Sequence, residues 1–178
     1  IDYETRIAAY VESVATLAIP TVAVVEGWAV GGGMAIASVC DFRIATPGAR
    51  FGVPIARTLG NCLAMGNLTV LVATLGLPMV KRMLLLAEMV PAEELTANGY
   101  VLKIEPPDNL DAAVSQLTEQ LASHAPITMA ASKEVLGTIV MDGDEDDQAI
   151  IEKVYGSADF SEGVSAFVAK RSPTWQGR

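Results

Sequence analysis

Residues 25–37 read VEGWAVGGGMAIA, and three consecutive glycines, Gly31 to Gly33, separate two apolar runs. The preceding run, residues 21–25, is rich in β-branched side chains, which is typical of a strand buried on both faces. The following run favours a short apolar helix. Glycine inside a helix or strand costs about 1 kcal/mol relative to alanine, so three in succession require a specific reason.

Two explanations fit the glycines from their spacing alone. The first turn of a helix has unpaired backbone N–H groups and a partial positive charge, and such donors stabilise a carbonyl oxygen that gains negative charge. Without Cβ atoms, a flat thioester can lie against this backbone. Close packing of a strand against a helix also selects glycine. The spacing therefore predicts either an oxyanion hole or a packing contact.

Strands and helices alternate in the first part of the chain, and helices alone follow. The segments expected to form strands are 21–25, 41–46 and 100–104. The segments expected to form helices are 2–18, a short one after the glycines, one ending near 75, 76–87, one from 91, 108–123, 127–140, 144–155 and 161–171. This order predicts an α/β body with a helical C-terminal subdomain.

Charge and hydropathy exclude several classes of protein. The net charge of −9 argues against a nucleic-acid binder, which would show a basic surface. Residues 58–80 carry no charge and are long enough to cross a bilayer. They contain two asparagines, three glycines and Pro78, however, so we expect buried segments and no membrane partner.

The cysteines indicate the compartment. Cys40 and Cys62 lie in apolar runs and no secretory leader is visible, which predicts reduced thiols and a cytoplasmic protein.

The glycines do not continue as other well-known motifs. The dinucleotide-binding pattern fails at Ile36, no Gly-Lys-Ser/Thr follows, and no G-x-S-x-G element is present. His124 is the only histidine and ends a polar-faced helix, which disfavours a Ser-His or Cys-His pair. The acidic run MDGDEDDQ (residues 141–148) has Asp147 and Lys153 where a calcium loop needs glycine and glutamate. We expect no metal.

The stretch IPTVAVVEGWAVGGGMAIASVCDFRIATPGARFGVP (residues 19–54) closely resembles the crotonase, or enoyl-CoA hydratase/isomerase, superfamily. The resemblance continues through AEMVPAEELTANGYVLKI (residues 87–104) and DFSEGVSAFVAKRSPTWQG (residues 159–177), and covers nearly the whole chain. Family chains extend further at the N-terminus, so this sequence is expected to correspond to the C-terminal two-thirds of a typical member.

The resemblance implies a fold, an assembly and a ligand. The fold is an α/β crotonase-like ββα spiral, with residues 1–106 as the C-terminal part of the spiral core and residues 107–178 as a helical trimerisation subdomain. The assembly is a homotrimer or hexamer. The ligand is an acyl-CoA thioester, with coenzyme A as part of the substrate and no permanently bound cofactor. The N–H of Gly32 is one oxyanion donor, and the second is expected upstream.

The sequence departs from the family at its two usual catalytic glutamates, which align with Ala35 and Ile55. Residues 42–87 contain no Asp or Glu, so ordinary two-glutamate hydration is not predicted. In related enzymes the loop after the second of these positions lines the acyl pocket. Here that loop carries Asn61 and Cys62, which are therefore candidate polar groups of the site.

Near the C-terminus, Phe167 and Lys170 match family positions where the aromatic ring packs and the lysine contacts a CoA phosphate. The resemblance favours an enoyl-CoA hydratase/isomerase-family lyase or isomerase that stabilises a thioester enolate. Two alternatives stay open: another crotonase-type reaction, such as decarboxylation or thioester hydrolysis, and a non-catalytic acyl-CoA-binding protein.

Overall fold

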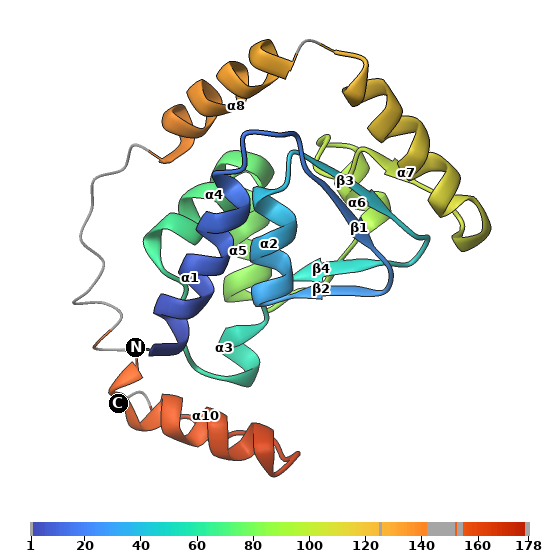
Figure 1. The fold of residues 1–178 in the computed structure, drawn as a ribbon. Helices are drawn as coiled ribbons and strands as arrows, with labels where there is room; N and C mark the ends of the chain where they lie inside the picture. Colours follow the sequence, from blue (N-terminus) through green and yellow to red (C-terminus); the bar gives the residue numbers. More distant parts are fainter. Residues whose placement is uncertain (1, 125, 142–151, 153–154, 177–178) are drawn as a thin grey trace.

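The computed structural model describes residues 2–124, 126–141, 152 and 155–176 (Figure 1). The helices within these residues are α1 (Asp2–Ala15), α2 (Gly32–Val39), α3 (Ile55–Thr58), α4 (Met65–Leu75), α5 (Leu77–Leu85), α6 (Ala92–Thr96), α7 (Pro107–Ala122), α8 (Pro126–Met141) and α10 (Ala158–Val168). The strands are β1 (Val22–Val25), β2 (Trp28–Val30), β3 (Phe42–Ala45), β4 (Arg50–Gly52), β5 (Val90–Pro91) and β6 (Lys103–Ile104). In the described part of the chain, no helix is both long and apolar enough to cross a membrane.

Two ββα units follow one another and stack in parallel. The first consists of β1, β2 and α2, and the second begins with β3 and β4 and continues into α3. Val22 of β1 lies opposite Phe42 of β3, and Trp28 of β2 lies opposite Arg50 of β4. Each unit thus supplies one strand to each of two sheets, ordered β1-β3-β6 and β2-β4-β5. Both sheets lie to one side of a layer made by α1, α2, α4 and α5 (Figure 1).

A glycine with positive φ turns the chain between the two strands of each unit. Gly27 (φ 84°) joins β1 to β2, and Gly48 (φ 77°) joins β3 to β4. Glycine adopts this left-handed conformation without steric cost. The Arg50 N–H donates to the Gly27 carbonyl at 2.7 Å, and the Gly48 N–H donates to Oε1 of Glu93 at 2.8 Å. The first bond therefore joins the corner of the first unit to β4 of the second, and the other joins the corner of the second unit to α6 (Ala92–Thr96).

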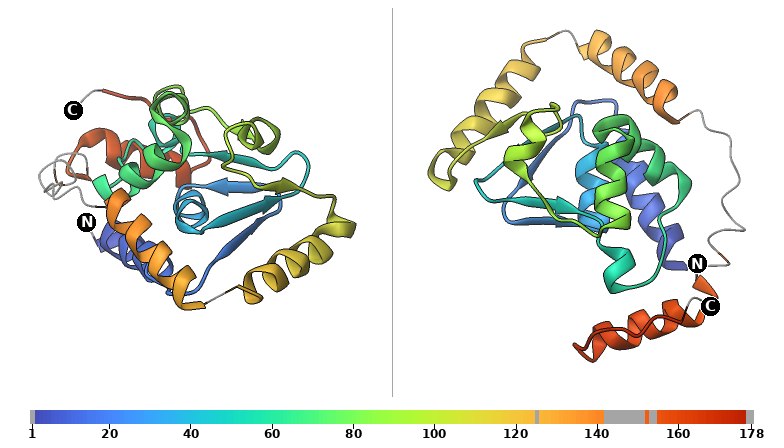
Figure 2. Two further views of the ribbon diagram at one scale, coloured as in Figure 1. Left: turned by 90° about the horizontal axis from the view of Figure 1, so that it is seen from above. Right: turned by 180° about the vertical axis from the view of Figure 1, so that it is seen from behind.

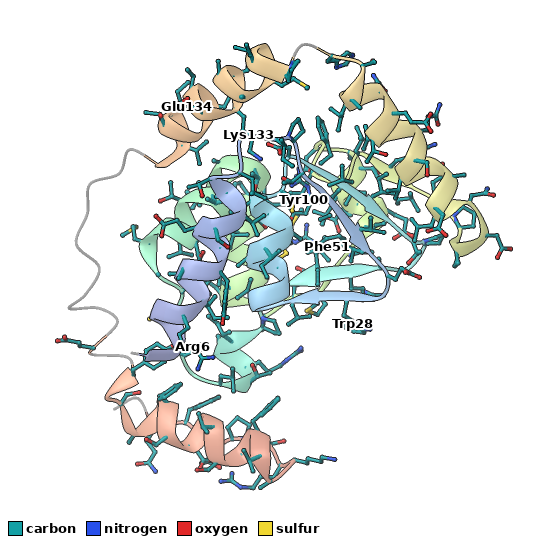
Figure 3. All side chains as sticks on the ribbon, viewed as in Figure 1. Arg6, Trp28, Phe51, Tyr100, Lys133 and Glu134 are labelled. Carbon is teal, nitrogen blue, oxygen red and sulfur yellow. The ribbon has the colours of Figure 1, made fainter. Side chains whose placement is uncertain are left out.

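The main core lies between the helical layer and the sheets. Met34 of α2, Phe51 of β4 and Tyr100 are among its fully buried members. The rings of Phe51 and Tyr100 meet edge to face with centroids 5.6 Å apart, which is a favourable aromatic geometry. Figure 3 shows both side chains inside the body. A smaller cluster joins Ile44 of β3 to Leu110, so that α7 packs on the first sheet.

Helix α8 packs on α4 and is also joined to the body through Lys133. Lys133 of α8 donates to Oδ2 of Asp41 at 2.7 Å and to the Ile19 carbonyl at 3.1 Å. The same Asp41 oxygen accepts from the N–H of Thr21 at 2.6 Å and from its hydroxyl at 2.8 Å. In Figure 2, α7 and α8 arch over the body, and α10 lies on the opposite side.

Several expected boundaries are wrong for identifiable reasons. The segment 100–104 is a strand only at Lys103–Ile104, because Tyr100 and Val101 turn into the core. The sequence does not predict β2, β4 and β5, which have three residues or fewer. By contrast, the expected division of the uncharged residues 58–80 into shorter pieces is confirmed, since they are shared among the end of α3, a loop, α4 and α5. The acidic run from residue 142 onward and most of the expected helix 144–155 lie outside the described residues.

Candidate active site

The first turn of α2 presents unpaired backbone donors. Gly31 precedes the helix with φ 55° and ψ −119°, and its N–H donates to the Gly52 carbonyl at 3.4 Å. Ala35 closes the first turn by donating its N–H to the Gly31 carbonyl at 3.0 Å. Within the described residues, the N–H groups of residues 32–34 have no acceptor. They point from the positive end of the helix, which favours an anionic or strongly polarised oxygen.

Packing does not explain the glycines. A Cβ atom added at Gly31 or Gly33 would have no neighbour within 4 Å. One added at Gly32 would meet the Cδ1 atom of Ile7 at 3.5 Å, which is an ordinary van der Waals distance. Glycine at position 31 is explained by its positive φ, since an L side chain there would be strained. The space beside the turn is thus open, as access to the free N–H groups requires.

The two positions that align with the family's glutamates lie in the apolar core. Ala35 is a buried residue of α2, 7% exposed, and Ile55 is 9% exposed and belongs to the main core. A carboxylate at either position would lose its hydration among apolar side chains. Nor does the described part of the chain gather three His, Cys, Asp or Glu side chains in one place. The helix donors therefore have no acid beside them at these two positions.

A loop of residues 59–64 joins α3 to α4 and carries Asn61 and Cys62. The N–H groups of its first two residues donate to the Ile55 carbonyl at 3.0 and 2.8 Å, which makes the start of the loop a tight turn. Asn61 and Cys62 are both half-buried. Helix α4, which follows the loop, packs on α2, so the loop and the Gly32 turn belong to one body.

The C-terminal segment folds back onto this loop. Gly163 of α10 lies so close to Leu59 that a Cβ atom on it would overlap the Leu59 carbonyl oxygen. The ring of Trp175 covers Gly60, where an added Cβ would lie 2.8 Å from it. Asn61 also contacts this segment, because its Nδ2 donates to the Tyr155 hydroxyl at 3.4 Å. Figure 1 shows α10 below α3.

Phe167 and Lys170 lie at the end of α10. Phe167 is 66% exposed, and Lys170 is exposed and has a left-handed backbone (φ 53°). The next residue, Arg171, donates its N–H to the Ala166 carbonyl at 3.0 Å and so closes the helix end. Among the described residues, no hydrogen bond or ion pair joins Phe167 or Lys170 to the Gly32 turn.

An ion pair fixes the chain after α10. Glu162 accepts from Arg171 at 2.6 Å and from the Thr174 N–H at 2.8 Å. The Arg171 guanidinium and the Thr174 N–H lower the pKa of Glu162 to about 2. This pairing directs the following residues back toward Gly60, where Trp175 packs.

Sequence reasoning misses three residues at this site. Ile7 of α1 borders Gly32, and Tyr155 and Trp175 border the loop that carries Asn61. Ile7 belongs to the apolar face of the first helix, which signals burial only. Tyr155 and Trp175 reach the loop from about a hundred residues away, so no local pattern identifies them.

The amino-acid sequence matches the family "Enoyl-CoA hydratase/isomerase" over residues 2–178. The chain belongs to this family. It is 31% identical over 163 residues to "Probable enoyl-CoA hydratase, mitochondrial" of Dictyostelium discoideum, covering 89% of this chain and 58% of the relative. It is also 31% identical over 163 residues to the "2,3-dehydroadipyl-CoA hydratase" of Escherichia coli K12, covering 89% and 64%. The chain thus spans about three fifths of the length of these curated relatives.

The fold matches solved structures, among them an enoyl-CoA hydratase of Mycobacterium avium subsp. paratuberculosis K-10 with a TM-score of 0.82 at 30% identity, covering 98% of this chain and 72% of that one. A methylmalonyl-CoA decarboxylase complexed with 2S-carboxypropyl-CoA superimposes with a TM-score of 0.89, at 23% identity, covering 97% of this chain and 68% of that one. At this identity the likeness shows the fold alone. The expected α/β crotonase fold is confirmed, and its ββα units place the Gly32 turn at the start of α2.

Proposed function

We propose that the protein binds an acyl-CoA thioester and stabilises its enolate with the N–H of Gly32. The open first turn of α2, with its unpaired N–H groups, is the observation that carries this proposal. In other enzymes, removing one hydrogen-bond donor from an oxyanion hole raises the reaction barrier by about 3 kcal/mol. Coenzyme A enters as part of the substrate, and Phe167 and Lys170 are proposed to contact it.

The reaction proposed is one that needs the oxyanion donor more than a pair of carboxylates. Decarboxylation of a malonyl-type thioester meets this requirement: the bond from Cα to the carboxylate breaks, and its electron pair enters the thioester enolate. Carbon dioxide leaves, and water supplies a proton to Cα. The presence of Ala35 and Ile55 at the positions of the two glutamates favours this reaction over hydration, because neither side chain can donate or accept a proton.

Hydration is the second candidate, because the two relatives at 31% identity are named as hydratases. Asn61 and Cys62 are the polar groups through which an unusual hydratase would act. Two assays separate the candidates: loss of the ultraviolet absorbance of crotonyl-CoA, and release of carbon dioxide from malonyl-CoA. If the full protein binds both esters and turns over neither, it is an acyl-CoA-binding protein.

Two substitutions at one position test the oxyanion donor itself. Gly32→Ala keeps the N–H and adds a methyl group at an ordinary distance from Ile7. Gly32→Pro removes the N–H, and proline is tolerated at the first position of a helix. Gly32→Ala keeps the donor but places a methyl group beside the thioester, so we expect it mainly to raise KM, whereas Gly32→Pro should lose about a hundredfold in kcat. Equal losses of kcat in two folded variants would contradict the proposal.

A homotrimer or hexamer is also proposed. Exposed apolar side chains along α8 support it, since each is at least 60% exposed: Ile127, Val135, Leu136 and Ile139. Large apolar side chains left exposed along one helix are typical of a face that contacts another protein chain. Light scattering of the full protein measures the mass, and a charged substitution such as Leu136→Glu should shift it to the monomer.

A further inference from the structure

Two buried hydroxyl groups connect the core to the first turn of α2. The hydroxyl of Ser38, in α2, donates to the Met34 carbonyl at 2.7 Å and lies 2.8 Å from the hydroxyl of Tyr100. Because the Ser38 hydroxyl has a single proton, Tyr100 is the donor between the two. Resting on the proposed function, we propose that Tyr100 and Ser38 are positioning residues, which hold the N–H of Gly32 in place for a thioester oxygen.

The turn that carries the donors has little support of its own. Gly31 has no side chain that could accept a hydrogen bond from the helix, and its N–H donates to the Gly52 carbonyl at a long 3.4 Å. Helix α2 has eight residues, and a helix of this length is not stable in isolation. Two glycines in its first turn add backbone freedom. The direction of the Gly32 N–H therefore depends on contacts from outside the helix.

Met34 is the residue through which the two hydroxyls act. It follows Gly32 by two residues in the same turn, and its side chain is fully buried. Ser38 bonds its carbonyl, and the Tyr100 hydroxyl lies 3.6 Å from its Sδ. The main chain and the side chain of Met34 are thus held by the same pair of hydroxyls, and a rotation of the turn would break both contacts.

Tyr100 itself has a fixed position relative to the sheets. The residue is 2% exposed, and its N–H donates to Oδ1 of Asn98 at 3.1 Å. Its ring meets that of Phe51, in β4, edge to face and lies 4.4 Å from the guanidinium of Arg43, in β3. Packed side chains of this kind can hold a supporting group to within about 0.5 Å, as a positioning role requires.

Stability alone does not explain the two hydroxyls. Phenylalanine at position 100 and alanine at position 38 would bury the same ring and the same Cβ atom without desolvating an oxygen. A bond between two buried neutral hydroxyls returns little net stability, because both groups give up bonds to water. The pair adds direction instead, since a satisfied polar network in a core fixes one arrangement of its members.

The test measures how strongly the protein polarises a bound thioester. Infrared difference spectra of butyryl-CoA, isotopically labelled at its carbonyl carbon, report a hydrogen bond to the thioester oxygen as a lowered C=O stretching frequency. We expect a lowered frequency on the full unaltered protein, and a return toward the solution value with Tyr100→Phe and with Ser38→Ala. The affinity for the ester, measured by calorimetry, should change by no more than about twofold, because weakening one neutral hydrogen bond costs little.

Kinetics and a cycle of variants separate positioning from a general loosening of the fold. With whichever of crotonyl-CoA and malonyl-CoA the protein turns over, we expect Tyr100→Phe to lower kcat about tenfold and to leave KM within about twofold. Because the two hydroxyls act in series, the double variant should lose no more than the worse single variant. Thr74→Val is the matched control, since the Thr74 hydroxyl makes the same kind of bond in α4, to the Val70 carbonyl at 2.8 Å. This control should leave the frequency and kcat unchanged.

The outcomes separate this inference from the proposed function. An unaltered protein that does not bind the ester, or binds it with the C=O frequency of free solution, overturns both. A lowered frequency that survives Tyr100→Phe or Ser38→Ala overturns this inference alone, and so does an equal loss in Thr74→Val. If one of the two single variants does not fold, the other decides. If neither ester is turned over, the frequency decides.

Discussion

Arg43 stacks its guanidinium 4.4 Å from the ring centroid of Tyr100 and donates from Nε to the backbone carbonyl of the same residue. Its Nη1 donates to the carbonyls of Ala37 and Cys40 at 3.0 and 2.6 Å, at the end of α2. Burial lowers the pKa of Arg43, yet four carbonyl groups in all surround the cation. The Arg43 side chain thus caps the C-terminal end of α2, the helix that begins at Gly32, and links that end to Tyr100.

Replacing this cation should destabilise the fold strongly. Arg43→Met leaves buried carbonyls unpaired, so we expect the free energy of unfolding to fall by about 3 kcal/mol or more. Arg50→Met is the control, because the Arg50 side chain is exposed and donates once, to the Met89 carbonyl at 3.2 Å; we expect a change within about 0.5 kcal/mol. Urea unfolding measures both. Similar losses in the two variants would show that the carbonyls around Arg43 are otherwise satisfied.

A second prediction concerns the contact between α10 and the loop. Gly163→Ala places a methyl group on the Leu59 carbonyl, and a backbone cannot yield as a flexible side chain does. We expect α10 to shift, with a loss of about 2 kcal/mol. Gly137→Ala in α8 is the matched control: nothing lies within 4 Å, so the change should stabilise the helix by up to about 1 kcal/mol. Thermal unfolding should move the two variants in opposite directions, and a stabilised Gly163→Ala would contradict the contact.

Acid should release the C-terminal segment. The folded pKa of Glu162 is about 2, well below its value of about 4.3 in an unfolded chain. The contribution of Glu162 is therefore complete above about pH 4.3 and is lost as the pH falls toward 2. Trp175 fluorescence, followed in a Trp28→Phe background, should change over this range. Glu162→Gln removes the titrating group, so its fluorescence should already resemble the released state at pH 7; an unchanged acid transition would assign it to another group.

The sequence predicts β1, the glycine turn and α2 because they depend on local patterns: a β-branched run, three glycines and an apolar run. The ββα fold itself is predicted only through the family resemblance, since no local pattern reveals β2. Short strands such as β5 carry too few residues for alternation to be visible, and only pairing with Phe51 and Arg50 forms them.

The surroundings of Asn61 could not be predicted in the same way. Tyr155 and Trp175 reach the loop through tertiary packing, and the packing depends on glycines at 60 and 163 whose role appears only when the chain is folded. Conversely, Ala35 and Ile55 are identified by alignment alone, but their burial in the core is a structural finding.

That burial gives the last prediction, in which the family's second glutamate is restored. Ile55→Glu places a carboxyl group where the side chain is 9% exposed, and burial raises the pKa of a carboxyl group above about 4.3. The penalty is full above the raised pKa and diminishes as the pH falls through it, because the neutral acid is cheaper to bury. At pH 8 we expect a loss of about 3 kcal/mol, and Ile55→Gln, of the same shape but uncharged, should lose less and show no such pH dependence. Urea unfolding between pH 4 and 8 gives the free energy of unfolding of both variants as a function of pH. If the two variants show the same pH dependence, a carboxylate at position 55 reaches water, and hydration through that position would regain support.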